Sequence, residues 1–365
     1  MNVRRILITA DTVGGVWTYA VDLARALGEI EIETILVIIG PPPTPAQRAT
    51  IARLDRVTLI QSDAALDWLA RDAAEIAAAG RKIAAIADDY AVDLVQLNSP
   101  ALAAEAEFAV PVVAVAHSCL ASWWEAVETG PLPDDFAWRN ALTRAGMVAA
   151  DAVVAPTHAF ATTTWRVHRL PATPQVVHNG RSLPSATAQP QKHYAFTAGR
   201  LWDRGKDLAT LDMAAATGLP IFAAGPLIGP GGDAIGFNHL TCLGLLDSTT
   251  LGAKFAARPV FVSTALYEPF GLAVLEAAQA GCALVLTDIP TFRELWNDAA
   301  LFVAPRDSNG FAAAIAGLLG NPAERGRRGA AAAAAAQRYT GTAMRDGMVA
   351  LYGVVARPSK DRVVA

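Results

Sequence analysis

The sequence is poor in cysteine and in charged residues. Its 365 residues include three cysteines, Cys119, Cys242 and Cys282, which are far apart. Their number and spacing indicate neither a disulfide framework nor a cysteine metal site, and they fit a reducing cytoplasm. Charged residues make up 18% of the chain and the net charge is −4. The chain therefore lacks the basic field that nucleic-acid binding would suggest.

Long apolar runs are also missing. No segment has 18 unbroken apolar residues, so we expect no membrane span. The N-terminal stretch MNVRRILITADTVGG has two arginines and a short apolar run without a small-residue cleavage site. We therefore interpret it as a first β-strand rather than a signal peptide.

Short apolar runs are abundant, since 53% of the residues are hydrophobic. Nearly unbroken apolar runs separated by helical stretches are typical of parallel strands buried on both faces. Thirteen runs predict such strands: RILITA, TILVIIG, VTLIQ, LVQLN, VPVVAVAH, DAVVAP and QVVHNG in the first half, and YAFTAGR, PIFAAGP, LTCLGL, PVFVSTA, ALVLTD and ALFVAP in the second.

The same pattern in both halves predicts two Rossmann-like, doubly wound α/β domains. Helices are expected at 16–28, 272–281 and 310–319, and in the alanine-rich stretch GAAAAAAAQRY. The polar, proline-bearing stretch RSLPSATAQPQKH, residues 181–193, is interpreted as a linker after a first domain of residues 1–180. Ligands of such folds bind at the carboxyl edges of the sheets, so we expect a cleft there.

Two motifs in the first half fall where a strand is expected to end. In ILITADTVGGVWTYAVDLARAL, Gly14 and Gly15 join a strand to a helix, and their amides suit an anionic oxygen. The spacing is not that of a dinucleotide fingerprint, and a plain strand-to-helix turn is the alternative. His117 ends the run VPVVAVAH, where it can donate a hydrogen bond to a substrate hydroxyl or carry a proton. A purely structural histidine is the alternative.

The stretch FTAGRLWDRGKDLATL brings cations to the second domain. Arg200 follows its first strand, and we expect Lys206 to begin the next helix. Two cations at the carboxyl edge of a sheet, on a glycine-bearing loop, would neutralise a phosphate or diphosphate. A solvated basic loop that includes Arg204 is the alternative.

The stretch YEPFGLAVLEAAQAG carries a carboxylate on each side of a Pro-Phe-Gly turn. We expect Glu268 to close the strand PVFVSTA and Glu276 to lie about one turn into the following helix. The unsatisfied first amides of that helix would meet a diphosphate. A phosphate would repel both carboxylates, so they must face neutral or positive groups, and sugar hydroxyls are the natural choice. Glu276 suits a ribose diol, and Glu268 suits a sugar whose anomeric carbon gains positive charge. Two surface glutamates are the alternative.

These residues carry a resemblance to a known family. EPFGLAVLE resembles the E-x7-E motif of the GT-B glycosyltransferases of family 4, a retaining, nucleotide-sugar-dependent group. TADTVGGVWTYAVDLARAL is similar to its N-terminal Gly-Gly loop, AHS to its active-site histidine element, VVHNG to its xPNG element, and GRL with a following lysine to its diphosphate clamp. AGCALVLTDIPTFREL is like its G-x-P-V-V segment. The resemblance covers nearly the whole chain.

The resemblance implies a role for each matched residue. The donor diphosphate would bind Arg200 and Lys206, and Glu276 would hold the ribose. His117 and Glu268 would address the transferred sugar as the catalytic pair. The remaining donor-site positions implied are Gly14, Gly15 and the turn Phe270, Gly271, Leu272 and Ala273.

The family also implies its own architecture and chemistry. A donor domain would cover 194–342, and a C-terminal helix at 343–365 would cross back to the N-terminal domain. The reaction would retain the anomeric configuration by front-face attack and need no metal and no cofactor beyond a UDP- or GDP-sugar co-substrate. The acceptor would be a sugar or a lipid-linked hydroxyl, and no nucleic acid would be involved.

The chain departs from the family pattern at three places. Lysine follows arginine by six residues instead of five, and Asp207 comes next, so Arg204 can share the role of Lys206. NGRS replaces the usual NGVD after Asn179, which weakens any role there. TDIPTFREL lacks a glycine, which puts Glu294 in doubt as a nucleotide contact.

Three other interpretations stay open. A GT-B nucleotide-sugar epimerase would release nucleotide without an acceptor. A non-catalytic nucleotide-sugar-binding protein would keep the clamp but lose Glu268 or His117. A weak contact with the inner face of the membrane is the third, because Arg166, His168 and Arg169 share one amphipathic stretch, for which an ordinary surface helix is the alternative.

Overall fold

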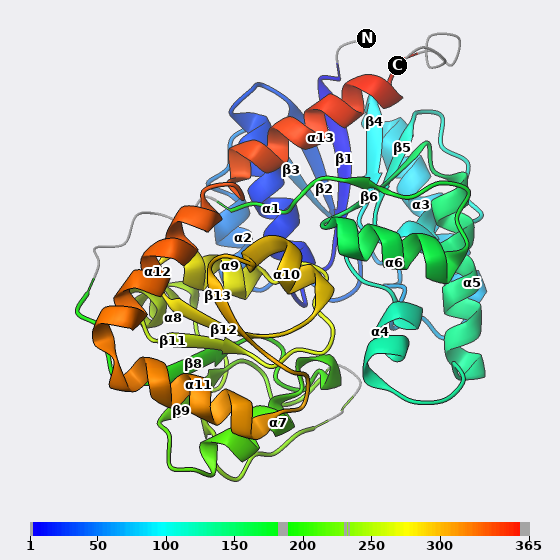
Figure 1. The fold of residues 1–365 in the computed structure, drawn as a ribbon. Coiled ribbons are helices and arrows are strands. Elements are labelled where there is room, and N and C mark those ends of the chain that lie inside the picture. The colour runs from blue at the N-terminus through cyan, green and yellow to red at the C-terminus, as the bar shows by residue number, and fades with distance from the viewer. Residues whose placement is uncertain (1–2, 182–188, 230–231, 233, 358–365) are drawn as a thin grey trace. The chain divides into compact units, whose positions relative to one another are not determined.

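The computed structural model describes residues 3–181, 189–229, 232 and 234–357 (Figure 1). The chain divides into two compact units. The first contains residues 1–125, 129–180 and 341–365, and the second contains residues 126–128 and 181–340. Of the expected linker 181–193, residues 182–188 lie outside the described residues, as do residues 358–365 of the expected C-terminal helical segment.

The first unit is built on a parallel sheet of seven strands in the order β3-β2-β1-β4-β5-β6-β7. Its strands are β1 (Arg5–Ala10), β2 (Glu33–Ile38), β3 (Val57–Gln61), β4 (Leu94–Leu97), β5 (Val112–Val115), β6 (Ala152–Ala155) and β7 (Gln175–Val176). The central strands are buried on both faces, as their unbroken apolar sequences require.

Helices supply the cover for both faces of this sheet. They are α1 (Gly15–Gly28), α2 (Pro45–Ile51), α3 (Ala73–Asp89), η1 (Pro100–Ala103), α4 (Leu120–Val127), α5 (Asp134–Ala149), α6 (His158–His168) and α13 (Gly341–Val355). Met344, Met348 and Tyr352 of α13 join α1 in one buried cluster on the sheet, while α3 contributes to the cluster on the other face. The last described helix of the chain therefore belongs to the first unit (Figure 1).

The second unit holds a parallel sheet of six strands in the order β10-β9-β8-β11-β12-β13. Its strands are β8 (Ala195–Ala198), β9 (Ile221–Ala224), β10 (Thr241–Cys242), β11 (Val260–Ser263), β12 (Ala283–Thr287) and β13 (Ala300–Val303). Its helices are η2 (Arg204–Lys206), α7 (Leu208–Ala215), α8 (Ser248–Ala256), α9 (Leu272–Gln279), α10 (Pro290–Trp296), α11 (Ser308–Gly320) and α12 (Pro322–Ala336).

The predicted α/β class with two parallel sheets is confirmed. Each of the thirteen predicted apolar runs covers one of the strands to within one residue. The alanines of the alanine-rich stretch lie in α12, where Ala332 and Ala336 are fully buried. Two local predictions were wrong. Lys206 ends the 3₁₀ turn η2 instead of beginning a helix, because Asp207 takes a left-handed φ of 46° and α7 starts only at Leu208. Glu268 does not close a strand, since β11 ends at Ser263 and Glu268 lies on the following loop.

Both sheets change winding direction at a defined pair of strands. In the first sheet β1 has β2 on one side and β4 on the other, and in the second sheet β8 lies between β9 and β11. Loops that leave such a pair diverge to opposite faces of the sheet and open a crevice at the carboxyl edge. The β1–α1 loop with Gly14, the loop after β8 with Arg200, and the loop after β11 with Glu268 all start at these switch points.

A histidine at the end of α6 is buried without hydrogen-bond partners. The His168 side chain is 1% exposed, and no described residue pairs with either ring nitrogen. Burial, aided by the charge of Arg144, lowers its pKa to about 4. The folded chain therefore keeps this ring neutral at pH values where the unfolded chain binds a proton.

This difference predicts a pH-dependent loss of stability. Between pH 6.5 and about 4 the unfolded state binds about one more proton at His168 than the folded state. The free energy of unfolding should fall with falling pH, with a slope of up to about 1.4 kcal/mol per pH unit from this group. His168→Leu should remove that part of the slope. Urea unfolding midpoints from pH 7 to 4.5 test it, and parallel curves for parent and variant would refute the assignment.

Candidate active site

A small cavity at the carboxyl edge of the second sheet brings together four of the predicted residues. Arg200, Lys206, Glu268 and Ala273 line it, together with Gly199 and Thr264. They come from the loop after β8, the turn η2, the loop after β11 and the start of α9. Side chains and backbone from four segments therefore converge at the switch point of this sheet.

The loop that carries Arg200 is held by close backbone packing. Gly199 donates its amide to the carbonyl oxygen of Ala224 at 3.0 Å. A Cβ on Gly225 would lie 1.8 Å from the carbonyl oxygen of Gly199, and Gly225 has a φ of 143° that side chains disfavour. Glycine at position 225 is therefore required, because any side chain there would overlap the backbone of the loop that carries Gly199 and Arg200.

Arg200 is oriented by an aspartate three residues later. Its Nη2 donates to Oδ2 of Asp203 at 2.9 Å, while Asp203 Oδ1 accepts the amide of Gly205 at 2.9 Å. The arginine side chain is 43% exposed, so one end of it remains open to an anion. Arg204 points elsewhere, to Glu128 at 2.8 Å, and is 70% exposed. The structure thus separates Arg204 from the position of Lys206.

Lys206 and Glu268 form a largely buried ion pair between their side chains. The side chains are 18% and 17% exposed. Backbone bonds hold the two segments together, because the Gly205 carbonyl accepts the amide of Leu266 at 2.9 Å and the Lys206 carbonyl accepts the Thr264 hydroxyl at 2.9 Å. Glu268 therefore faces the ammonium group of Lys206.

The turn after Glu268 prepares a helix start without a side-chain cap. Gly271 takes a left-handed φ of 88° as the N-cap of α9, and within the described part of the chain this helix start has no side-chain cap. No acidic residue lies in the first turn. The amides of Leu272 and Ala273 therefore begin a helix without a capping side chain, and Glu268 is the nearby carboxylate. The Phe270 side chain is buried and packs edge-on against Tyr339 at 5.7 Å, so only its backbone can face a ligand.

Glu276, one turn into α9, is paired with Arg181. The two side chains form an ion pair and are 12% and 20% exposed. Arg181 is also fixed through its backbone, since its amide donates to the Tyr339 carbonyl at 3.1 Å and its carbonyl accepts from Gln279 at 2.9 Å. The departure NGRS from the family pattern predicts a weaker role for this segment. The structure instead places the unusual arginine directly on the second carboxylate of the motif.

In the first unit, Gly14 and Gly15 lie at the start of α1. Gly14 is the N-cap, and neither a side-chain cap nor an acidic residue is present in the first turn. Asp11 stabilises the approach by accepting the amide of Val13 at 2.7 Å. This helix start resembles that of α9 in offering amides at a switch point.

His117 follows β5 and contacts Asn98, just after β4, and Tyr19 of α1. Its Nε2 lies 3.0 Å from Oδ1 of Asn98, and Tyr19, one turn after Gly15, packs edge-on against its ring at 4.5 Å. Burial lowers the pKa of His117 to about 3. The ring is therefore neutral at pH 7 and cannot act there as a cationic proton donor.

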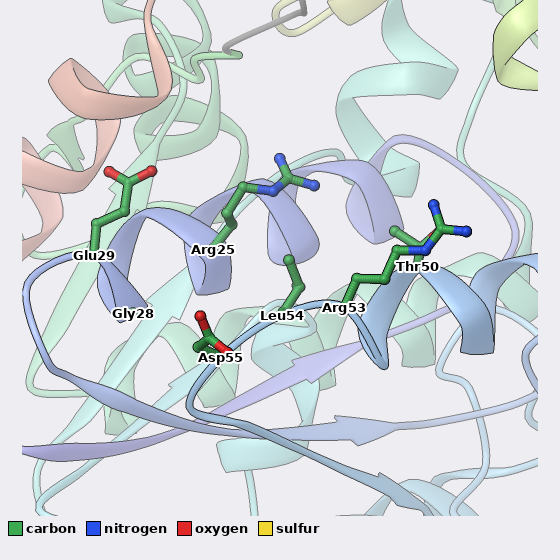
Figure 2. Close-up of a pocket in the computed structure, with 7 residues that line it drawn as sticks. All are labelled: Arg25, Gly28, Glu29, Thr50, Arg53, Leu54 and Asp55. Carbon is green, nitrogen blue, oxygen red and sulfur yellow. The ribbon is translucent and has the colours of Figure 1, made fainter.

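A larger hollow lies at the amino end of the first sheet, at the edge opposite to the one that carries Gly14 and His117. This hollow has a volume of about 440 Å³ and lies beside the last residues of α1 and the end of α2 (Figure 2). Arg25, Arg53, Glu29 and Asp55 line it, two cations against two anions. It contains none of the predicted site residues. Because helix α1 ends there instead of beginning there, it offers carbonyl groups instead of amides.

The amphipathic stretch of α6 does not present three cations. His168 is buried, and Arg166 is paired with Glu125 at 2.6 Å. Arg169 follows the helix in a left-handed conformation. Among the described residues, no helix is long and apolar enough to cross a membrane.

Comparison with solved structures shows the same fold. Sucrose-phosphate synthase from Thermosynechococcus elongatus matches with a TM-score of 0.78 and 19% identity, over 96% of this chain and 98% of that chain. HepE of Anabaena in complex with UDP-glucose matches with a TM-score of 0.71 and 18% identity, over 96% and 99%. These likenesses establish the GT-B fold of two Rossmann-like units.

Curated relatives match a shorter segment. Glycogen synthase of Mycobacterium tuberculosis is 42% identical over 100 residues, which are 27% of this chain and 23% of that protein. Phosphatidyl-myo-inositol mannosyltransferase of Mycolicibacterium smegmatis is 36% identical over 91 residues, 24% of this chain and 23% of that protein. Each match thus spans about a quarter of the relative.

Two family models cover most of the chain between them. Glycosyltransferase Family 4 matches residues 13–183, and Glycosyl transferases group 1 matches residues 236–335. The first includes Gly14, Gly15 and His117, and the second includes both glutamates of the E-x7-E motif. Arg200 and Lys206 lie between the matched segments, where the structure brings Lys206 onto Glu268. The chain belongs to family 4 of the GT-B glycosyltransferases.

Proposed function

We propose that this protein is a retaining, metal-independent glycosyltransferase, which moves a sugar from a nucleotide-diphosphate sugar to a hydroxyl acceptor. One observation carries the proposal: Arg200, Lys206 and Glu268 line one cavity with the uncapped start of α9. Cations and helix amides bind phosphate. The carboxylate beside them suits a hydrogen-bond donor such as a sugar hydroxyl.

In the proposed complex, the charged side chains bind three parts of the donor: the diphosphate, the ribose and the transferred sugar. Its diphosphate accepts from Arg200, Lys206 and the amides of Leu272 and Ala273. Its ribose diol donates to Glu276, which requires Arg181 to share or release that carboxylate. Glu268 holds a hydroxyl of the transferred sugar and stabilises the positive charge that develops at the anomeric carbon.

The reaction balances without a covalent enzyme intermediate. The bond between the anomeric carbon and the phosphate oxygen breaks while the acceptor oxygen bonds to that carbon on the same face. The acceptor proton passes to the leaving phosphate oxygen. His117, neutral at pH 7, contacts the transferred sugar and does not supply this proton. Arg200 and Lys206 take over the charge compensation that a metal supplies elsewhere.

Uridine is the base we expect first, with guanosine second. HepE of Anabaena was solved with UDP and with UDP-glucose, and the matched relatives are named for glycogen and for phosphatidyl-myo-inositol. These names support a glycan, a small sugar or a lipid-linked alcohol as acceptor, handled on the cytoplasmic side.

The diphosphate site is tested by nucleotide-dependent thermal unfolding. UDP, GDP, ADP, dTDP and CMP are compared with and without EDTA. A nucleotide at about 100 times its dissociation constant should stabilise the parent by about 2.7 kcal/mol, which raises the midpoint by a few degrees. Arg200→Ala should lose the shift. Arg204→Ala, a matched arginine that pairs with Glu128, should keep it.

The outcomes separate the alternatives. Equal shifts in the parent, Arg200→Ala and Arg204→Ala would refute the diphosphate site. A shift that vanishes with EDTA would refute metal independence. Binding without transfer to any hydroxyl acceptor would favour the non-catalytic interpretation, and release of free nucleotide and altered sugar without an acceptor would favour the epimerase.

Glu268 is expected to act on turnover more than on donor binding. Glu268→Gln removes the negative charge where positive charge develops, and kcat should fall on the order of 10²-fold. The dissociation constant for the nucleotide diphosphate should change less, because Lys206 is then released from its carboxylate. Steady-state kinetics with direct binding measures both. Glu324→Gln, which alters an arginine-paired carboxylate on α12, is the control. Equal losses in both variants would contradict a specific role.

Glu276 is expected to recognise the ribose diol. The parent should bind UDP more tightly than 2′,3′-dideoxy-UDP by about tenfold, the value of one charge-assisted hydrogen bond. Glu276→Gln should lower the preference between the two nucleotides. Arg181→Val, which removes the competing cation, should preserve the preference and tighten UDP binding. Calorimetric titration measures all four combinations, and an unchanged preference in Glu276→Gln would rule out the ribose contact.

A further inference from the structure

A chain of hydrogen-bonded polar side chains runs from α13 to the half-buried His117 in the first unit. Its members are Tyr352, Gln96, Asn98 and the histidine, and Gln96 and Tyr352 are almost fully buried. Among these four, only His117 enters the proposed mechanism. Buried amides and hydroxyls are tolerated only when each donor meets an acceptor, so the bonds determine one another.

Asn98 is the fixed point of the chain because the backbone of Thr9 orients it. Its amide nitrogen Nδ2 donates to the Thr9 carbonyl at 2.6 Å, and its backbone amide donates to the Thr9 hydroxyl at 2.9 Å. A carbonyl only accepts, so Nδ2 must face Thr9. The other end of the side chain, Oδ1, must then face Gln96 and His117.

The tautomer of His117 follows from this orientation. Asn98 Oδ1 lies 3.0 Å from Gln96 Nε2 and 3.0 Å from His117 Nε2. An amide oxygen has no proton to give, so His117 Nε2 carries the hydrogen. Burial keeps the ring neutral, and Nδ1 then holds a lone pair.

Tyr352 of α13 forms the other end of this chain of polar side chains. Gln96 turns Nε2 toward Asn98 and also toward the Tyr19 hydroxyl at 3.4 Å, which leaves its Oε1 to accept from the Tyr352 hydroxyl. If that hydroxyl were absent, Oε1 would be buried without this donor. The Tyr352 hydroxyl therefore favours the amide orientation that protonates His117 on Nε2.

We propose that Tyr352, Gln96 and Asn98 are positioning residues that hold His117 as the Nε2–H tautomer, so that its Nδ1 accepts a hydrogen bond from a hydroxyl of the transferred sugar. This rests on the proposed function for the sugar contact alone. A lone pair attracts a hydroxyl and repels a carboxylate or phosphate oxygen. The arrangement thus selects a donor sugar with a hydroxyl at that position over one with an anionic substituent.

The tautomer is measured directly, without substrate. Histidine-selective ¹⁵N labelling of the full chain and long-range ¹H–¹⁵N spectra report which ring nitrogen is protonated, and His117→Gln identifies the signal. The parent should show protonated Nε2 and unprotonated Nδ1 at pH 7. A protonated Nδ1, or two protonated nitrogens, would overturn the proposal whatever the outcome of the activity assays.

The role of α13 is tested by removing one hydroxyl. Tyr352→Phe should give a mixture of tautomers at His117, because the Thr9 carbonyl alone then orients the amides. The value of kcat should fall in proportion to the lost Nε2–H fraction, with the nucleotide dissociation constant unchanged. Tyr90→Phe, a hydroxyl removal in the same unit outside the chain, should leave the tautomer unchanged. Unaltered His117 signals in a folded Tyr352→Phe protein would overturn the role of Tyr352.

A second variant tests this chain of polar side chains itself. Gln96→Met keeps a side chain of similar length but neither donates nor accepts in the same way. Adding Tyr352→Phe to it should change the tautomer and kcat no further, because the path between them is already broken. Additive effects would show that Tyr352 acts by another route. Failure of transfer in a parent with the expected tautomer would instead refute the proposed function.

Discussion

Parallel strand pairing is the constraint on which the candidate site depends. In a parallel sheet every strand delivers its following loop to the same edge, so residues distant in sequence meet without any pairing between their own segments. The loops after β8 and β11 start on adjacent strands, and this adjacency brings Lys206 onto Glu268 although 61 residues separate them. The winding order matters as much, since both sheets reverse direction at these pairs.

Charge compensation is the second constraint on the site. Glu268 and Glu276 lie within one turn of a helix start, and each is paired with a cation from another segment. A largely buried carboxylate is costly unless it is paired, so Lys206 and Arg181 stabilise the motif in the absence of ligand. The same cations are then partly occupied, and a diphosphate must compete for Lys206. Arg200 differs, because it is more exposed and its aspartate also serves the neighbouring turn.

The fold could be predicted from the sequence more completely than the side-chain pairs within the site. Unbroken apolar runs located every strand, because a strand buried on both faces leaves a local signature. The position of Lys206 relative to the helix was wrong, since a single left-handed aspartate decides it. Arg181, Asn98, Gln96 and Tyr352 were missed as partners for another reason. Their contacts join segments up to 256 residues apart, and no local pattern encodes them. An arginine in place of the usual residue after NG was the one available signal.

The proton balance of the proposed transfer follows from the electrostatics of the two units taken separately. In the first unit, burial makes the imidazolium form of His117 unfavourable, and Nε2–H donates its hydrogen bond to Oδ1 of Asn98. The histidine therefore has a lone pair to orient a hydroxyl but little basicity to remove its proton. In the second unit, Glu268 is engaged by Lys206 and is poorly placed to act as a base while that pair persists. The leaving phosphate is the remaining strong acceptor, and its charge grows as the glycosidic bond breaks. A site that positions hydroxyls and leaves deprotonation to the departing group is thus what these side chains support.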